Sequence, residues 1–149
     1  MKFNSAIALA AVAAVTFAAT AVIAQQDPIA ARKELMKGNG AEARAGAAMA
    51  KGDTPFDLAR AQKIFANYAE SGAKLPGLFP ENSKSGGDTS ASPKIWEDMA
   101  GFKAASDKFA ADAKAAGAQV KDLDSFKAGF SAVSRNCGSC HETYRVKKS

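Results

Sequence analysis

The chain of 149 residues contains only two cysteines and one histidine. A structural zinc site needs four ligands, usually cysteine or histidine, so these three side chains disfavour one. No pair of carboxylates falls at a spacing that indicates general acid–base catalysis, and Glu34 and Glu42 are typical of solvated helix faces. The sequence therefore predicts a protein that is not an enzyme.

Two further features are missing. No segment alternates apolar and polar residues as a half-buried strand does, so the chain predicts an all-α fold. No cluster of Lys and Arg is interleaved with aromatic residues, which argues against nucleic-acid binding. The net charge of +5 is spread along the chain. It indicates either weak attraction to an acidic partner or simply a solvated lysine surface.

The one long apolar run lies at the start of the chain, over residues 6–21. Lys2 precedes the run, and the small residues that end at Ala24 follow it, which is typical of a secretory signal peptide. We expect a signal peptide over residues 1–24, a mature chain of one domain over residues 25–149, and no membrane span in it. A membrane anchor is disfavoured because the run is rich in alanine and ends at a cleavage pattern.

All three scarce residues lie together as Cys137-Gly138-Ser139-Cys140-His141. This pattern is the attachment signature of a c-type haem, in which two thiols bind the vinyl groups covalently and the histidine ligates the iron. On a helix, positions i, i+3 and i+4 share one face. The sequence therefore predicts one covalent haem c. Because the single histidine of the chain would bind the haem iron, none remains for a catalytic triad.

Two other interpretations of the paired cysteines are weaker. A thioredoxin-like dithiol would accompany a βαβ pattern, and the chain shows no strand. A disulfide between Cys137 and Cys140 is compatible with an oxidising compartment. However, residues three apart on a regular helix hold their sulfur atoms in poor bridging geometry.

The apolar periodicity predicts four helices that form an antiparallel up-down-up-down bundle with the haem inside it. Three helices are expected to start at an N-cap residue followed by proline, and the fourth at Asp122 or Asp124. The apolar residues of 75–80 should pack on the bundle, and the polar residues of 81–90 should be exposed. The expected helices cover residues 27–50, 53–72, 92–117 and 122–145.

The glycines of Gly38-Asn39-Gly40 lower the helix propensity of the first segment. They indicate either a break in the helix or small residues that let the backbone approach a flat ligand. The pattern does not decide between these two interpretations.

The position of the haem motif on the last helix resembles class II cytochromes c, which include cytochrome c prime and the low-spin cytochrome c-556 type. The resemblance covers the whole mature chain. The c-556 type is favoured by four other stretches: Leu35-Met36-Lys37-Gly38-Asn39-Gly40, Ala50-Lys51-Gly52-Asp53-Thr54-Pro55-Phe56-Asp57, Leu75-Pro76-Gly77-Leu78-Phe79-Pro80 and Ser92-Pro93-Lys94-Ile95-Trp96.

The resemblance implies haem thioethers at Cys137 and Cys140, a proximal iron ligand at His141 and a distal ligand at Met36. It also implies that Arg145 lies near the proximal face of the haem. A periplasmic location and redox partners in the periplasm follow from the same resemblance. Related bundles often dimerise through their first two helices, so the resemblance is compatible with a homodimer, and the sequence does not decide between a monomer and a dimer.

Whether Met36 ligates the iron decides between electron transfer and gas binding. A methionine sulfur on iron makes the centre six-coordinate and low-spin, and His/Met ligation raises the reduction potential and suits electron transfer. If Met36 only packs over the haem, the iron is five-coordinate and can bind NO or CO. Helical methionines more often fill a core than bind metal, as we expect of Met49 and Met99. The sequence favours ligation and electron transfer.

Overall fold

The computed structural model describes residues 27–147, so the expected signal peptide over 1–24 lies outside the described residues. The fold is all-α, as predicted. In chain order, its elements are α1 (Pro28–Lys51), α2 (Leu58–Lys74), the short 3-10 helices η1 (Leu75–Leu78) and η2 (Glu81–Ser83), α3 (Lys94–Glu97), α4 (Met99–Gln119) and α5 (Leu123–Tyr144).

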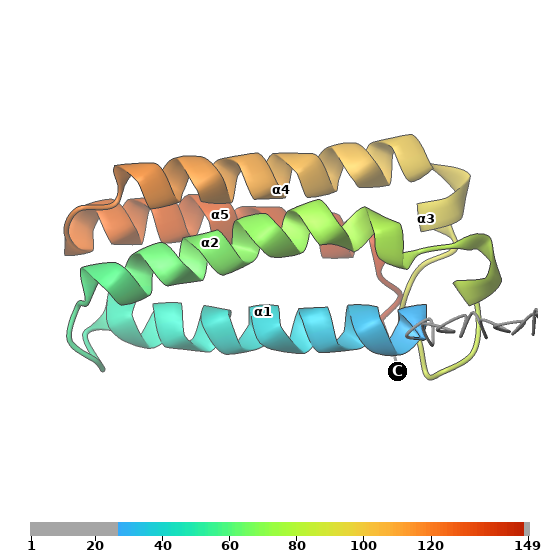
Figure 1. The fold of residues 1–149 in the computed structure, drawn as a ribbon, viewed down its shortest axis with the longest axis horizontal. Coiled ribbons are helices and arrows are strands. Elements are labelled where there is room, and N and C mark those ends of the chain that lie inside the picture. Colours follow the sequence, from blue (N-terminus) through green and yellow to red (C-terminus); the bar gives the residue numbers. More distant parts are fainter. Residues whose placement is uncertain (1–26, 148–149) are drawn as a thin grey trace, which may run out of the picture.

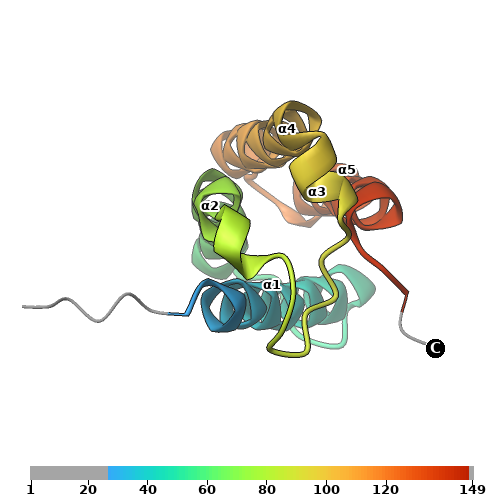
Figure 2. The ribbon, with the colours of Figure 1, turned by 90° about the vertical axis from the view of Figure 1, so that its right-hand side faces the viewer.

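The four long helices run antiparallel to their neighbours and form a bundle (Figure 1). The end view in Figure 2 places α1, α2, α4 and α5 at the four corners, with the segment from η1 to α3 crossing one end. The C-terminal end of α5 and the N-terminal end of α1 lie at that same end of the bundle. The haem motif of α5 is therefore brought toward Met36 of α1. Within residues 27–147, no helix is long and apolar enough to cross a membrane.

One expected helix start is wrong, and one expected helix is divided in two. α2 begins at Leu58 rather than near Asp53, because the Asp57 carboxylate caps the helix by accepting a hydrogen bond from the backbone N–H of Arg60 at 2.6 Å. The third segment is split at Asp98, whose backbone leaves the helical region and whose carboxylate caps α4. In both cases an aspartate side chain accepts a hydrogen bond from a free N–H group in the first turn of the helix, and the helix begins directly after that aspartate.

The other boundaries are closer to expectation. Asp27 caps α1, and Asp122 forms a capping box with Ser125 at the start of α5. α1 is continuous through Gly38-Asn39-Gly40, so these glycines do not break the helix. α4 continues past Gly117 to Gln119.

The bundle has two buried clusters. The central cluster holds Met49, Ala61, Ile64, Phe65, Tyr68, Ala113, Val120, Phe126 and Val133. The end cluster lies under the crossing segment and holds Leu75, Phe79, Ile95 and Phe102. Leu75 and Phe79 confirm that the apolar part of the connection packs on the bundle. The expectation that residues 81–90 are exposed is wrong for Ser83, which is 1% exposed, because its hydroxyl and carbonyl both accept hydrogen bonds from Arg32.

Gly72 of α2 packs tightly against α4. A Cβ atom at this position would lie 2.9 Å from the Cβ of Ala110 and 3.0 Å from the backbone O of Ser106. The Ser106 hydroxyl also donates a hydrogen bond to the Gly72 carbonyl at 2.9 Å. The two helices therefore have no room for a side chain here.

We expect Gly72→Ala to lower the free energy of unfolding by about 1–3 kcal/mol, the usual cost of overpacking. Gly38→Ala is the matched control, because a Cβ atom at Gly38 would have nothing within 4 Å. In an exposed helix that change should stabilise the protein by about 0.5–1 kcal/mol. Urea unfolding followed by circular dichroism measures both, and equal effects of the two variants would contradict this packing.

Candidate haem-binding site

The haem motif occupies the last two turns of α5. Cys137 and Cys140 are free thiols and are half-buried, whereas His141 is exposed. Because all three residues are helical, the i, i+3, i+4 spacing holds them on adjacent positions of one helix surface. That surface lies at the end of the bundle where α1 begins.

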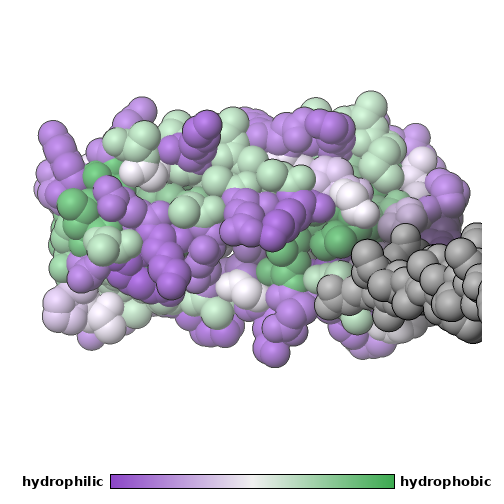
Figure 3. All heavy atoms as spheres, in the orientation of Figure 1, coloured by the Kyte–Doolittle hydropathy of each residue, from purple (hydrophilic) through white to green (hydrophobic). Residues whose placement is uncertain are grey.

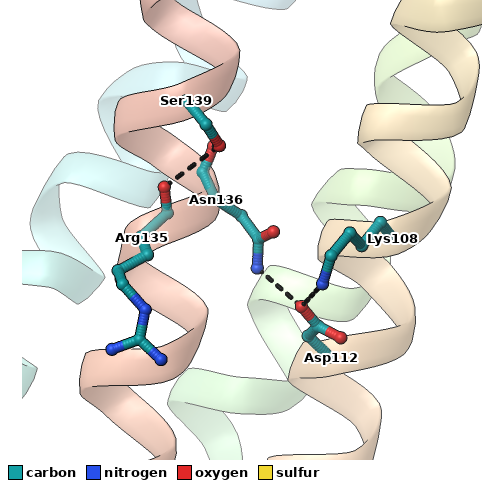
Figure 4. Close-up of polar contacts among 5 residues, drawn as sticks. All are labelled: Lys108, Asp112, Arg135, Asn136 and Ser139. Atoms are coloured by element: carbon teal, nitrogen blue, oxygen red, sulfur yellow. Dashed lines mark hydrogen bonds and ion pairs between the residues drawn. The ribbon is translucent and has the colours of Figure 1, made fainter.

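A polar contact holds this part of α5 against α4 (Figure 4). Asn136, the residue before Cys137, donates a hydrogen bond from Nδ2 to Asp112 Oδ2 at 2.8 Å. Lys108 pairs with the same carboxylate oxygen. Hydrogen bonds from Lys108 and then Asn136 hold the pKa of Asp112 below its usual value, so the carboxylate stays charged. The contact fixes where the cysteine turn begins.

Met36 and Cys140 are brought to the same place. Both are partly buried, and both pack against the end cluster, Met36 from α1 and Cys140 from α5. Leu35 and Tyr144 pack against the same cluster. The predicted distal methionine therefore lies at the end of the bundle that carries the haem motif.

Met49 and Met99, which we expected to be core filler, are placed differently. Met49 is buried in the central cluster, and Met99 packs against the end cluster from the start of α4. Neither lies on the stretch of α1 that contains Met36.

The electrostatic environment of the two thiols differs from that of a catalytic dithiol. Burial raises the pKa of Cys137, and burial followed by the charge of Cys137 raises the pKa of Cys140. Catalytic dithiols instead have a thiol whose pKa is lowered, so that the reactive thiolate is populated. Within residues 27–147, no group of three or more His, Cys, Asp or Glu side chains could hold a metal ion.

Arg145 follows the motif directly after α5 and has extended backbone. Its backbone forms an isolated β-bridge with Ala91, which ties the chain end to the loop before α3. Partial burial and then the positive charge of Arg145 lower the pKa of His141. The neutral imidazole, which is the form that binds a metal, is therefore favoured.

Arg32 is the main residue whose contacts the sequence did not predict. It is 4% exposed, and its guanidinium lies over the ring of Phe79 at 4.6 Å and that of Trp96 at 5.8 Å. It lies one turn before Met36 and three residues after the buried Ile29. Its place on the apolar stripe of α1 is the signal that could have shown it to be buried.

Glu42 was also misjudged. Its side chain is only 15% exposed, and its carboxylate pairs with Arg60 Nη2 of α2 at 2.6 Å. Asn67 of α2 donates a hydrogen bond to the other carboxylate oxygen at 2.7 Å. Glu42 therefore belongs to the contact between α1 and α2 rather than to a solvated face.

These residues fit a haem held by its edge. Two free thiols and an imidazole emerge from one turn of helix, a thioether packs from the facing helix, and aromatic rings pack beneath them. The fold and the site define a class of protein, a four-helix bundle that carries one covalent haem near one end.

The family follows from the comparisons. Residues 27–145 match the family model described as Cytochrome C′, and the chain belongs to this family, whose members carry covalently attached haem c. A cytochrome c′ from Rhodopseudomonas palustris is 50% identical over 85% of this chain and 87% of its own length. A cytochrome c-556 from the same organism is 36% identical over 91% of this chain and 93% of its own length.

The chain also matches solved structures of a cytochrome c′ and of a cytochrome c556. The chain matches a cytochrome c′ from Rhodopseudomonas palustris with a TM-score of 0.80 and 50% identity, over 84% of this chain and all (100%) of that one. It matches an oxidised cytochrome c556 from R. palustris with a TM-score of 0.76 and 34% identity, over 84% of this chain and 100% of that one. The chain is thus similar to members of both branches of the family.

Proposed function

We propose that the protein is an electron carrier whose haem iron is held by His141 and Met36 in a six-coordinate, low-spin state. The observation that carries this proposal is the packing of Met36 and Cys140 against the same cluster from facing helices. In this proposal, Cys137 and Cys140 form the thioethers and His141 is the proximal ligand. Arg145 lies near the proximal side, where its charge favours a neutral His141.

The haem supplies one-electron chemistry, and the chain supplies ligands, burial and orientation. Cys137 and Cys140 fix the edge of the haem to α5, and the contact of Asn136 with Asp112 fixes α5 to α4. A thioether from Met36 favours ferrous over ferric iron and thereby raises the reduction potential. The buried side chains of the end cluster would shield a haem bound at this end from water. No residue of the chain is required to react.

A second candidate is a five-coordinate haem that binds NO or CO. The observation that favours it is the 50% identity to a relative named cytochrome c′, compared with 36% for one named cytochrome c-556. In that case Met36 packs over the haem without ligating it. The optical spectrum of the ferric protein separates the two, since only sulfur ligation gives low-spin bands with a sulfur-to-iron charge-transfer feature.

Export and assembly belong to the same proposal. We propose secretion to the periplasm, cleavage after Ala24, redox partners in that compartment and a homodimer through α1 and α2. The face in Figure 3 is mixed, with hydrophilic side chains over most of it and smaller apolar areas between them. Sedimentation of the purified protein tests the dimer.

The attachment itself is tested by mass spectrometry of the mature protein from its host. We expect a chain that begins at Gln25 and carries the mass of one haem, and no bound haem in the Cys137→Ala/Cys140→Ala double variant. Ser139→Ala is the matched control inside the motif, because among residues 27–147 the Ser139 hydroxyl bonds only to the backbone oxygens of Arg135 and Asn136. A wild-type mass without haem, or a double variant that retains it, would overturn the assignment.

A further inference from the structure

Asn39 of α1 lies one turn beyond Met36, between two glycines. Its Nδ2 atom donates a hydrogen bond of 2.7 Å to Ser71 Oγ of α2. Asn39 is half-buried, and Ser71 is 3% exposed. Asparagine is disfavoured inside a helix because its side chain competes for nearby backbone groups, but this one bonds to the neighbouring helix. The bond ties α1 to α2 close to the proposed iron ligand.

Residues 37–44 of α1 belong to neither of the two buried clusters. Among residues 27–147, nothing would lie within 4 Å of a Cβ atom at Gly38. A Cβ atom at Gly40 would have only the side chain of Arg44, on the same helix, at 3.6 Å. This stretch of α1 therefore adds no apolar side chain to the core, and its attachment to α2 depends on polar side chains.

Two polar contacts join this stretch to α2. The first is the bond made by Asn39. In the second, Glu42 accepts a hydrogen bond from Asn67 at 2.7 Å and pairs with Arg60. Asn39 is three residues from Met36 along the helix, and Glu42 is six. The position of Met36 relative to α2 is therefore set more directly by Asn39 than by Glu42.

Ser71 is a firm anchor for this bond, because the next residue, Gly72, packs tightly against α4. A Cβ atom at Gly72 would lie 2.9 Å from the Cβ of Ala110, and the Gly72 carbonyl accepts a hydrogen bond from Ser106. α2 and α4 are thus held together at this height of the bundle. Asn39 joins α1 to that fixed point.

We propose that Asn39 is a positioning residue for Met36: its bond to Ser71 holds α1 at the height and rotation from which the Met36 sulfur reaches the haem iron. Methionine has three rotatable bonds, so its own side chain does not fix the place of the sulfur. A metal ligand has to be held within about 0.5 Å of its productive position, and here the backbone of α1 supplies that restraint. The inference rests on the proposed ligation by Met36 and adds a residue that makes it favourable.

The test measures the CO affinity of the ferrous holoprotein, because CO has to displace the Met36 sulfur. Loss of one ordinary hydrogen bond should shift the equilibrium between sulfur-bound and sulfur-free iron about fivefold. Asn39→Ala should therefore bind CO about fivefold more tightly than the wild type. Ser71→Ala removes the other partner and should give the same change. The double variant should show no further increase, because the two residues share one bond.

Asn67→Ala is the matched control, since it removes a bond of the same length between the same two helices, at Glu42. The free energy of unfolding in urea should fall by similar amounts in Asn39→Ala and Asn67→Ala. Only Asn39→Ala should raise the CO affinity. Equal CO affinities in the two variants overturn the proposal, whether both rise or neither does.

The same substitution in the Met36→Leu background separates positioning from other effects on CO binding. With no sulfur to displace, Asn39→Ala should leave the CO affinity of Met36→Leu unchanged. An increase in this background would show that Asn39 acts without Met36, and it overturns the proposal. A high-spin wild type refutes ligation by Met36 and this inference together. A low-spin wild type whose CO affinity is unchanged by Asn39→Ala refutes this inference alone.

Discussion

Replacing Met36 by leucine should convert the ferric haem from low-spin to high-spin almost completely. Leucine fills nearly the same volume, and such swaps usually cost less than about 1.5 kcal/mol of stability. The packing of residue 36 against the end cluster should therefore survive while the sulfur ligand is lost. The optical spectrum should lose its sulfur-to-iron charge-transfer band, and the reduction potential should fall, because His/Met ligation is what raises it.

Met49→Leu is the matched control for this variant. Met49 lies on the same helix and is buried in the central cluster, away from the end cluster that Met36 contacts. Its spectrum should remain that of the wild type, with a similar small change in stability. A high-spin wild-type spectrum, or a Met36→Leu protein that stays low-spin, would show that Met36 is not the ligand.

Gas binding provides an independent measure of the same change. With sulfur on iron, CO has to displace the ligand before it binds, so the wild type should bind CO weakly. Met36→Leu opens that position and should bind CO at least about tenfold more tightly, which corresponds to about 1.4 kcal/mol. CO titration of the ferrous protein, followed at the Soret band, gives both affinities. Equal affinities would favour the five-coordinate candidate for the wild type.

The parts of the fold that could be predicted from the sequence are those set by local pattern. Phe126, Val133 and Cys140 recur at helical spacing along one face of α5. Because Phe126 and Val133 are buried, Cys140 of the haem motif faces the bundle as well. The scarcity of cysteine and histidine leaves a single place for haem attachment. Met36 was suggested only by the resemblance to a known motif, and only the fold shows that Met36 and Cys140 pack against the same cluster.

The errors arise where two local signals compete or where a partner is distant in sequence. Asp53 and Asp57 both precede α2, and only the structure shows that Asp57 caps it. Glu42 was assigned to a solvated face because its partner Arg60 lies on another helix. A charged residue on a helix is exposed unless the fold brings it a partner, and no periodicity identifies that partner.

Arg32 is the clearest case, because its partners lie 46 to 57 residues away. Its guanidinium donates hydrogen bonds to the backbone O of Leu78 at 3.2 Å, to the Oγ and O atoms of Ser83, each at 2.9 Å, and to Thr89 Oγ1 at 2.8 Å. It forms no ion pair with a carboxylate of residues 27–147. The planar fork of arginine suits such a set of acceptors, and lysine cannot reproduce it.

We expect Arg32→Met to lower the free energy of unfolding by about 3 kcal/mol, because it removes these bonds and leaves buried acceptors of Ser83 without donors. The melting temperature should fall by about 10 °C for a domain of this size. Arg44→Met is the control, since Arg44 is an exposed arginine on the same helix, and it should change stability by less than about 0.5 kcal/mol. Equal losses in the two variants would contradict the role of Arg32.

The loss of stability in Arg32→Met should be greatest in the segment from η1 to α3, which crosses the end of the bundle near the haem motif. Lys84 is exposed and follows Ser83 directly, so trypsin should cut there faster in Arg32→Met than in Arg44→Met. Because Met36 packs under the same segment, through the end cluster that contains Phe79, a loosened segment should also raise the high-spin fraction of the ferric haem. Faster cleavage without any change in spin state would show that the segment does not hold Met36 in place.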